Sequence, residues 1–235
     1  MKKIILFYFI LLPFFVLSQN QGKIWYFGTN AGIDFNTNPP TALTNGQLET
    51  NEGCASIADT NGQLLFYTDG IKVWNSNHAL MPNANGSVPL GGDPSSSQSG
   101  IIVPDPSSPN KYYIFSVSAY SASNVFYSKV DMTLNGGLGD VDSTVRAVPL
   151  LSGTGEYIQS ILSGDGTFYW VIMHKANTNS YYAYKVTATG VNSTPVISSV
   201  GSTLPASGEI GYIKFNSAGT KIIRTGYISG AFDLS

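Results

Sequence analysis

The feature that most constrains the fold of this chain is a turn that recurs at roughly equal intervals. The glycine or asparagine of this turn stands at Gly62, Asn110, Gly166 and Gly219, so successive turns are 48, 56 and 53 residues apart. Each turn lies between two short apolar runs, as in LSGDGTFYW and FNSAGTKII. A period of this length, with several strands in each copy, is typical of a β-propeller, because one small sheet cannot bury both of its faces without a neighbour on each side.

The clearest copy of the repeat surrounds the segment LSGDGTFYW. Four runs separated by turn residues cover 157–162, 168–173, 181–186 and 195–200. The Asp165-Gly166 turn stands before the second run, and the polar turn at 177–179 joins the second run to the third. Short runs joined by such turns are typical of antiparallel strands. We therefore predict that the repeating unit is a four-stranded antiparallel meander.

A less regular form of the same pattern extends over the rest of the chain. Strands are expected at 53–58, 64–68 and 71–75, at 100–104, 111–118, 125–133 and about 141–151, and at 210–216 and 221–227. Residues 37–50 would form a connecting loop, and residues 81–98 an exposed loop, because Pro, Asn, Gly and Ser are frequent there. The run at 25–27 precedes the first full repeat, a position from which a propeller often completes the outer strand of its last blade.

The sequence as a whole predicts an all-β chain in which residues 19–235 form a β-propeller of four-stranded antiparallel blades. At about 50 residues per blade the chain supplies about four blades, the low end of the ~4 to 8 that propellers contain. The fourth blade stops at Ser235 before it is complete, so we expect an incomplete ring. A closed four-bladed ring and a β-sandwich with an accidental repeat are the alternatives that the sequence leaves open.

Residues 1–18 have the pattern of a secretory signal peptide. Two lysines precede an apolar run at residues 4–17, and the small residue Ser18 follows it. This order predicts cleavage after Ser18. A membrane anchor needs about 20 apolar residues, whereas this run has 14 with Pro13 inside it. We therefore expect a secreted or cell-surface protein with no membrane span in the mature chain.

The composition agrees with an exported all-β protein. Charged residues make up 11% of the chain, against about 25% in an average protein. The 43% of hydrophobic residues argues against disorder, and the lack of a basic cluster argues against a nucleic-acid partner. Cys54 is the single cysteine, so no intrachain disulfide can form. Its neighbours Gly53 and Ala55 indicate a small core residue rather than a reactive thiol.

A resemblance to a known family is carried by four segments. They are WYFGTNAGIDFN, TALTNGQLETNEGCASIADTNGQLLFYTDGIKVWNSNHALMPN, SSSQSGIIVPDPSSPNKYYIF and YSKVDMTLNGGLGDV. Together they resemble the N-terminal propeller region of large secreted proteins of gliding bacteria, which carry a gliding-motility-associated, type IX secretion sorting domain at the C-terminus. SGDGTFYW and FNSAGTKII are similar to the blade turn of TolB-type propeller repeats.

This resemblance covers nearly the whole chain after residue 18. It implies export across the outer membrane and display or release at the cell surface, commonly with PKD-like modules between the propeller and the sorting domain. The 235 residues include neither the modules nor the sorting domain. The family has no established catalytic residues to carry over, so the resemblance informs location more than chemistry.

Four polar residues occupy equivalent positions just ahead of the first strand of each blade. They are Glu52, Glu156 and Glu209, each ten residues before the turn glycine, and Gln98, twelve residues before Asn110. Because the first strand of a blade lines the central channel, these four side chains should ring one mouth of it. Carboxylates that converge there would bind a cation or the donor groups of a ligand.

An alternative is that each of these side chains is solvated or accepts a hydrogen bond from the backbone N–H of the next blade. The four residues are the candidate ligand-binding site, and a structural Ca²⁺ is the one cofactor considered. No residue is assigned a catalytic role.

Other motifs are weaker. Asp59 with Asn61, and Asp140 with Asp142, resemble pieces of calcium loops but lack the 12-residue spacing of an EF-hand, so capping of turns is expected instead. His78 and His174 have no HxxxH spacing and are expected to be exposed or hydrogen-bonded within the fold.

Catalytic motifs are incomplete or missing. The segment at 163–170 is close to the Asp-box of sialidases, but its glycine comes one place early. A sialidase-like site needs three arginines, whereas the chain contains only Arg146 and Arg224. No GxSxG, HExxH, P-loop or GxGxxG motif is present.

Two classes of function follow from these observations. The preferred one is a non-enzymatic propeller that presents its loop face to an extracellular glycan or protein partner. The aromatic groups Tyr112-Tyr113, Tyr181-Tyr182 and Phe168-Tyr169-Trp170 could stack on sugars, although such residues more often pack between blades. The other is a polysaccharide hydrolase or lyase that uses two carboxylates at the mouth of the channel.

Overall fold

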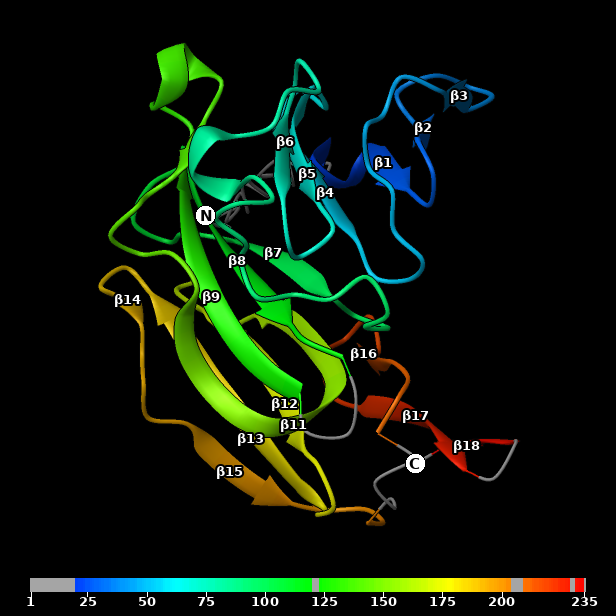
Figure 1. The fold of residues 1–235 in the computed structure, drawn as a ribbon. Helices are drawn as coiled ribbons and strands as arrows, with labels where there is room; N and C mark the ends of the chain where they lie inside the picture. The colour runs from blue at the N-terminus through cyan, green and yellow to red at the C-terminus, as the bar shows by residue number, and fades with distance from the viewer. Residues whose placement is uncertain (1–19, 120–122, 204–208, 229–230, 235) are drawn as a thin grey trace, which may run out of the picture.

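The computed structural model describes residues 20–119, 123–203, 209–228 and 231–234. Its regular structure is antiparallel β-strand apart from three short 3-10 turns, at Asn20–Gly22, Pro82–Ala84 and Asn135–Gly137 (Figure 1). The all-β prediction is therefore confirmed. None of the helical turns in these ranges is long and apolar enough to cross a membrane. The signal peptide predicted at residues 1–18 lies outside the described residues.

The described strands form four sheets. The first sheet contains β1 (Ile24–Phe27), β2 (Ala31–Asp34) and β3 (Thr41–Leu43), and the second contains β4 (Ala55–Ala58), β5 (Leu64–Thr68) and β6 (Val73–Asn75). The largest contains β7 (Gly100–Pro104), β8 (Lys111–Val117), β9 (Ser123–Asp131), β10 (Asp140–Val141), β11 (Val148–Leu162), β12 (Tyr169–Lys175), β13 (Ser180–Thr187), β14 (Gly190–Val191) and β15 (Val196–Ser199). The last contains β16 (Ile213–Phe215), β17 (Ile222–Ile228) and β18 (Ala231–Leu234).

The nine-stranded sheet consists of two meanders that share the long, strongly curved strand β11 (Figure 1). The first half of β11 pairs with β9, from Val148 opposite Tyr127 onward. Its second half pairs with β12, from Ile158 opposite Met173 onward, and the register shifts between Thr154 and Ile158. One meander is therefore β7-β8-β9-β11 and the next is β11-β12-β13-β15. The four-stranded meander predicted for residues 157–200 is confirmed.

The core lies between consecutive sheets, as strand β8 shows. Tyr112 and Ile114 face a hydrophobic cluster that they share with β4, β5 and β6. Tyr113 and Phe115, which alternate with them, face a second cluster shared with β12 and β13. Because both faces of the strand are covered, its residues from Tyr112 to Val117 are all buried, which is why β8 reads as a continuous apolar run.

The other sheets are covered in the same way. In β5, Phe66 belongs to the cluster shared with the first meander of the large sheet, whereas Tyr67 belongs to a cluster with Ile24 and Tyr26 of β1. At the other end, a small cluster joins Tyr157 and Tyr181 of the second meander to Ile213 of β16. Each cluster is thus shared by neighbours along the chain.

Two segments predicted as loops do more than connect strands. Within residues 37–50, β3 pairs with β2. The prediction of an exposed loop at 81–98 is wrong, because Met81, Ala84 and Leu90 are fully buried in the cluster around β4, β5 and β6. The Met81 N–H also donates to the carbonyl of Val73 and so extends the pairing of β6. The turn-forming composition predicts an irregular backbone in this segment, but it does not show that some of its apolar side chains are buried.

Strand β1 belongs to the first sheet. It pairs with β2, and its other edge meets the side chain of Ser56. The Ser56 hydroxyl accepts from the N–H of Tyr26 at 3.3 Å and donates to the carbonyl of Ile24 at 2.9 Å. Among the described strands, β1 pairs with β2 alone, and the expected pairing of residues 25–27 with a final blade stays a prediction.

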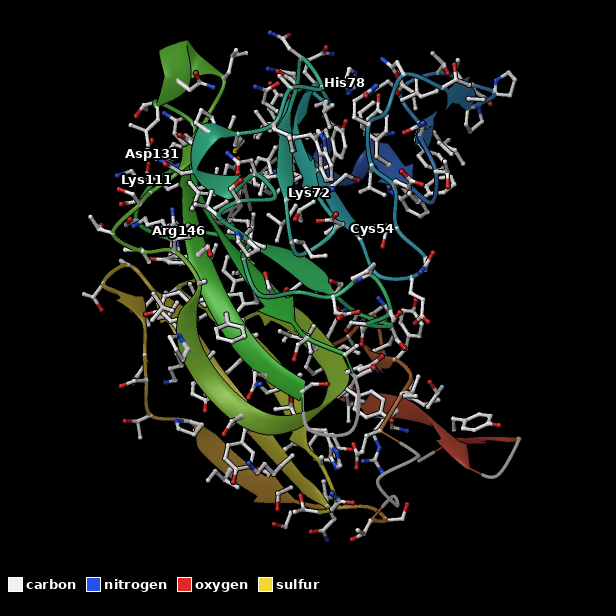
Figure 2. The ribbon with its side chains drawn as sticks, in the orientation of Figure 1. Cys54, Lys72, His78, Lys111, Asp131 and Arg146 are labelled. Carbon is white, nitrogen blue, oxygen red and sulfur yellow. The ribbon has the colours of Figure 1, made fainter. Side chains whose placement is uncertain are left out.

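The recurring turns are held by a carboxylate or amide oxygen that accepts from nearby backbone N–H groups. Asp59 Oδ1 accepts from Asn61 and Gln63, both at 2.8 Å, and Asn216 Oδ1 plays the same part in the last copy. Asp142 Oδ1 likewise accepts from the N–H and hydroxyl of Thr144. The capping predicted for Asp59 and Asp142 is confirmed, whereas Asp140 is buried and accepts mainly from the distant Asn83. Ion pairs add to the strand contacts beside the turns, as between Lys111 and Asp131 (Figure 2).

Gly70 allows a test of the contact between β5–β6 and the following segment. Its φ is +82°, and a Cβ there would lie 2.3 Å from the carbonyl oxygen of Ser99. Gly70→Ala should lower the free energy of unfolding by about 2–4 kcal/mol, because backbone strain and overpacking add. Gly164→Ala is the control, since a Cβ there meets nothing within 4 Å. Urea unfolding curves that fall together for both variants would contradict this packing.

Asp105, in the turn of the second copy, should make stability depend on pH. Its Oδ2 lies 2.7 Å from Lys129 Nζ, and its Oδ1 accepts from Ser107. Burial acts to raise the pKa of Asp105, but the hydrogen bonds and charge of Lys129 and the bonds from Ser107 outweigh it, so the pKa lies below its usual value. A depressed pKa in the folded state stabilises the fold above the ordinary pKa of Asp, about 4, and this contribution is lost as the pH falls through the folded-state pKa.

Asp105→Asn should lower the free energy of unfolding by about 1–2 kcal/mol at pH 7. In urea unfolding experiments at successively lower pH, from pH 5 towards pH 3, this difference from the wild-type chain should become smaller. A cost that stays constant over this range would show that the carboxylate charge contributes nothing.

Candidate functional site

The first strands of the successive meanders line one groove with a volume of about 900 Å³. Its walls come from β1, β4, β7, the second half of β11 and the segment of β16. These strands lie against one another in chain order, with β4 beside both β1 and β7, and β11 beside both β7 and β16. The groove is therefore built from equivalent positions of the repeat.

The lining of this groove combines aromatic rings, neutral polar groups and aliphatic side chains such as Ile101, Ile161 and Leu162. Trp25 is 51% exposed and Tyr212 is 46% exposed, although both belong to otherwise well-packed segments. Among the lining residues that the structure describes, Glu52 and Lys214 are the only charged ones. The walls thus offer apolar ring faces, hydroxyl groups and amides with little charge.

Glu52 is the predicted site residue that faces the groove with an exposed side chain. It lies near Tyr212, and both Glu52 and Cys54 add to the effect of burial in raising the pKa of the Tyr212 hydroxyl. Cys54 stands immediately before β4 (Figure 2) and is half-buried against the cluster of Tyr26 and Tyr67. Burial, followed by the charge of Asp69, raises the pKa of its thiol. Cys54 therefore lacks the depressed pKa of a reactive cysteine.

Gln98 also borders the groove, but its amide oxygen is engaged within the fold. The Oε1 atom accepts from the N–H of Ile158 at 3.3 Å and from the N–H of Ile213 at 3.0 Å. The side chain is only 6% exposed. Since Gln98 precedes β7, Ile158 lies in β11 and Ile213 begins β16, one side chain links three successive meanders.

Glu156 is buried and bonded to the preceding copy. Its Oε2 accepts from the N–H of Ser97 at 2.7 Å and from the Ser97 hydroxyl at 3.0 Å. The backbone N–H of Glu156 in turn donates to the carbonyl of Glu209 at 2.9 Å. The carboxylate of Glu156 therefore holds the start of one first strand against the next.

Glu209 is fully buried at the end of a series of contacting polar side chains that the sequence did not suggest. Its Oε1 accepts from the N–H of Asn177 at 3.0 Å, and its Oε2 lies 3.2 Å from Nδ1 of His174. The other ring nitrogen of His174 contacts Nη1 of Arg224. Because an arginine can only donate, Nε2 of His174 must accept, which places the ring hydrogen on Nδ1, where it donates to Glu209.

Arg224 is also held by aromatic rings and by the backbone. Its guanidinium lies 5.8 Å from the ring centre of Tyr157 and 5.9 Å from that of Tyr181, and its Nη2 donates to the carbonyl of Ser202. The arrangement offsets the buried charge of Glu209 through His174. No spacing in the sequence could have linked His174, Glu209 and Arg224, since they come from separate strands and loops.

The four predicted site residues thus do not form one ring of exposed groups. Glu156 and Glu209 accept hydrogen bonds from neighbouring backbone and are not in the groove lining. Gln98 also accepts from backbone, although it borders the groove, and Glu52 faces the groove. Within the described ranges, no group of three or more His, Cys, Asp and Glu side chains is placed to hold a metal ion. A ligand-binding role for Glu52, Gln98, Glu156 and Glu209 stays a prediction.

The chain matches no family model, no curated protein and no solved structure.

Gln98→Ala should destabilise the fold by about 2–4 kcal/mol, because it leaves two buried N–H groups, each worth ~1–3 kcal/mol, without an acceptor. Gln63→Ala is the matched control, since the Gln63 side chain is exposed and only its backbone takes part in the Asp59 turn. Thermal and urea unfolding would measure both. Equal stability of the two variants would mean that the Gln98 link contributes nothing.

Proposed function

We propose that residues 19–235 form a β-propeller module, an incomplete ring of about four blades, that binds an extracellular glycan or protein without chemical change. The observation that carries this proposal is the groove, whose walls are the first strands of consecutive meanders. In a propeller the first strand of each blade faces the central channel. A rigid channel lined by equivalent strands is a common place for a ligand.

The packing of the sheets supports the propeller rather than the two-layer sandwich. In a sandwich two sheets would share one core between them. Here the hydrophobic clusters lie in series, each between one sheet or meander and the next along the chain, and the middle strand β8 is covered on both faces. Blades stacked face to face around an axis have this pattern.

The proposed location rests on the sequence alone. The pattern of residues 1–18 supports export, and the low content of charged side chains agrees with an extracellular protein. The resemblance to type IX secreted proteins of gliding bacteria suggests the outer cell surface. We propose on these grounds a secreted or cell-surface protein.

The groove favours binding over hydrolysis. A polysaccharide hydrolase of the predicted kind would need two carboxylates facing the substrate. Among the described residues that line the groove, Glu52 carries the single carboxylate. Glu156 and Glu209 are occupied by Ser97, Asn177 and His174 instead.

The test combines an array of glycans and surface proteins with an assay for new reducing ends. It uses residues 19–235, the chain that remains after the predicted cleavage. We expect retention of a partner, no release of reducing ends, and the same retention by Glu156→Gln, whose carboxylate meets Ser97 rather than the groove. Reducing ends that appear with the wild-type chain and disappear with Glu52→Gln would instead establish the hydrolase.

A further inference from the structure

The geometry of the groove points to its ligand class. We propose that it takes a neutral polysaccharide whose sugar rings stack on Trp25 and Tyr212. This inference rests on the proposed binding function and specifies the partner for the same groove. It follows from two exposed aromatic rings, from the neutral polar groups in the same lining and from the small number of charges.

Trp25 is held as a rigid platform. Its indole Nε1 donates to the carbonyl of Gly22 at 2.9 Å, and the edge of Phe35 packs against it with ring centres 5.0 Å apart. Even so, 51% of the side chain is exposed, and it lines the groove. An indole whose N–H is already satisfied offers its ring face rather than a hydrogen bond, and the apolar face of a pyranose ring fits such a surface.

Tyr212 supplies a second ring from the other end of the series of sheets. Its backbone is fixed by Thr225, whose hydroxyl accepts from the Tyr212 N–H at 3.0 Å and whose N–H donates to the Tyr212 carbonyl at 2.9 Å. The side chain is 46% exposed in the same groove. Because the backbone is already ordered and an aromatic side chain has only two rotatable bonds, stacking on it loses little conformational entropy.

The rest of the lining suits hydroxyl-rich ligands better than charged ones. Gln159, Ser160 and Ser217 contribute amide and hydroxyl groups. Glu52 and Lys214, the two charged residues of the described lining, have opposite signs and leave the walls without net charge. An anionic or cationic polymer would find no cluster of opposite charge, whereas a neutral one meets both stacking faces and hydrogen-bonding groups. At about 900 Å³, the groove lies near the upper end of the ~300–1,000 Å³ range of small-ligand sites.

The experiment is affinity electrophoresis of the full mature chain in gels that contain one polysaccharide each. Laminarin, hydroxyethyl-cellulose, dextran and galactomannan are the neutral probes, and alginate and polygalacturonate are the anionic ones. We expect retardation by at least one neutral probe and by neither anionic probe. Trp25→Ala and Tyr212→Ala should each weaken that binding at least tenfold. Tyr227→Ala is the matched control, because Tyr227 is 40% exposed but does not line the groove.

Trp25→Phe guards against misfolding, since it keeps an aromatic ring beside Phe35. It should bind more tightly than Trp25→Ala and unfold at nearly the same temperature as the wild-type chain. Retardation by the anionic probes alone, or neutral binding that survives both alanine substitutions, would overturn the inference. Retention of a protein with no binding to any neutral probe would also overturn it, while leaving the proposed binding function in place. Release of reducing ends would overturn the binding function itself.

Discussion

The amide oxygen of Gln98 accepts hydrogen bonds from two backbone N–H groups that belong to the next two meanders. It stands just before β7, and its two donors lie in β11 and β16. Buried backbone donors need an acceptor there, and a side chain has to supply it. Glu156 and Glu209 do the same for Ser97 and Asn177. The stacking of the sheets, and hence the groove, depends on these side chain to backbone bonds.

The repeat and its strands could be predicted from the sequence because turns and apolar runs are local signals. Asp59, Asp165 and Asn216 cap their own turns, so each copy is recognisable by itself. The burial of the loop at 81–98 could not be predicted, because Met81 and Leu90 pack against residues distant in sequence, such as Ile114. The merging of two predicted strands into β11 also depends on partners on either side.

The sequence located Glu52 and Gln98 near the groove, but it could not show that Glu156 and Glu209 lie outside the groove lining. Counting back from the turns found Glu52, Gln98, Glu156 and Glu209, which do occupy equivalent places ahead of the turns. Whether each side chain points into the groove or into the adjoining copy is decided by its neighbours. Ser97 offers Glu156 a backbone N–H and a hydroxyl, so that carboxylate turns inward. Trp25 and Tyr212, which face the groove, have no signal in the sequence beyond alternation within short strands.

These observations divide the polar residues of the molecule into two groups. One group, which includes His174 and Arg224, is buried and offsets the charge and backbone donors at the junctions between sheets. The other lines the groove, is mostly uncharged and surrounds exposed aromatic rings. Gln98 belongs to both groups, because it borders the groove and also links the sheets. Under the proposed function, ligand contacts would come mainly from the other residues of the groove, which make none of these links.

Hydrogen exchange of individual amides measures the central claim most directly. The hydrogen bonds of Gln98, Glu156 and Glu209 are accepted from the N–H groups of Ser97, Ile158, Asn177 and Ile213. If these bonds hold the sheets together, the four N–H groups should exchange as slowly as that of Ile114 in the middle strand β8, because all of them would exchange through the same unfolding event. Rapid exchange of these four amides while Ile114 stays protected would contradict the account, because the sheets would then be held by their apolar clusters alone.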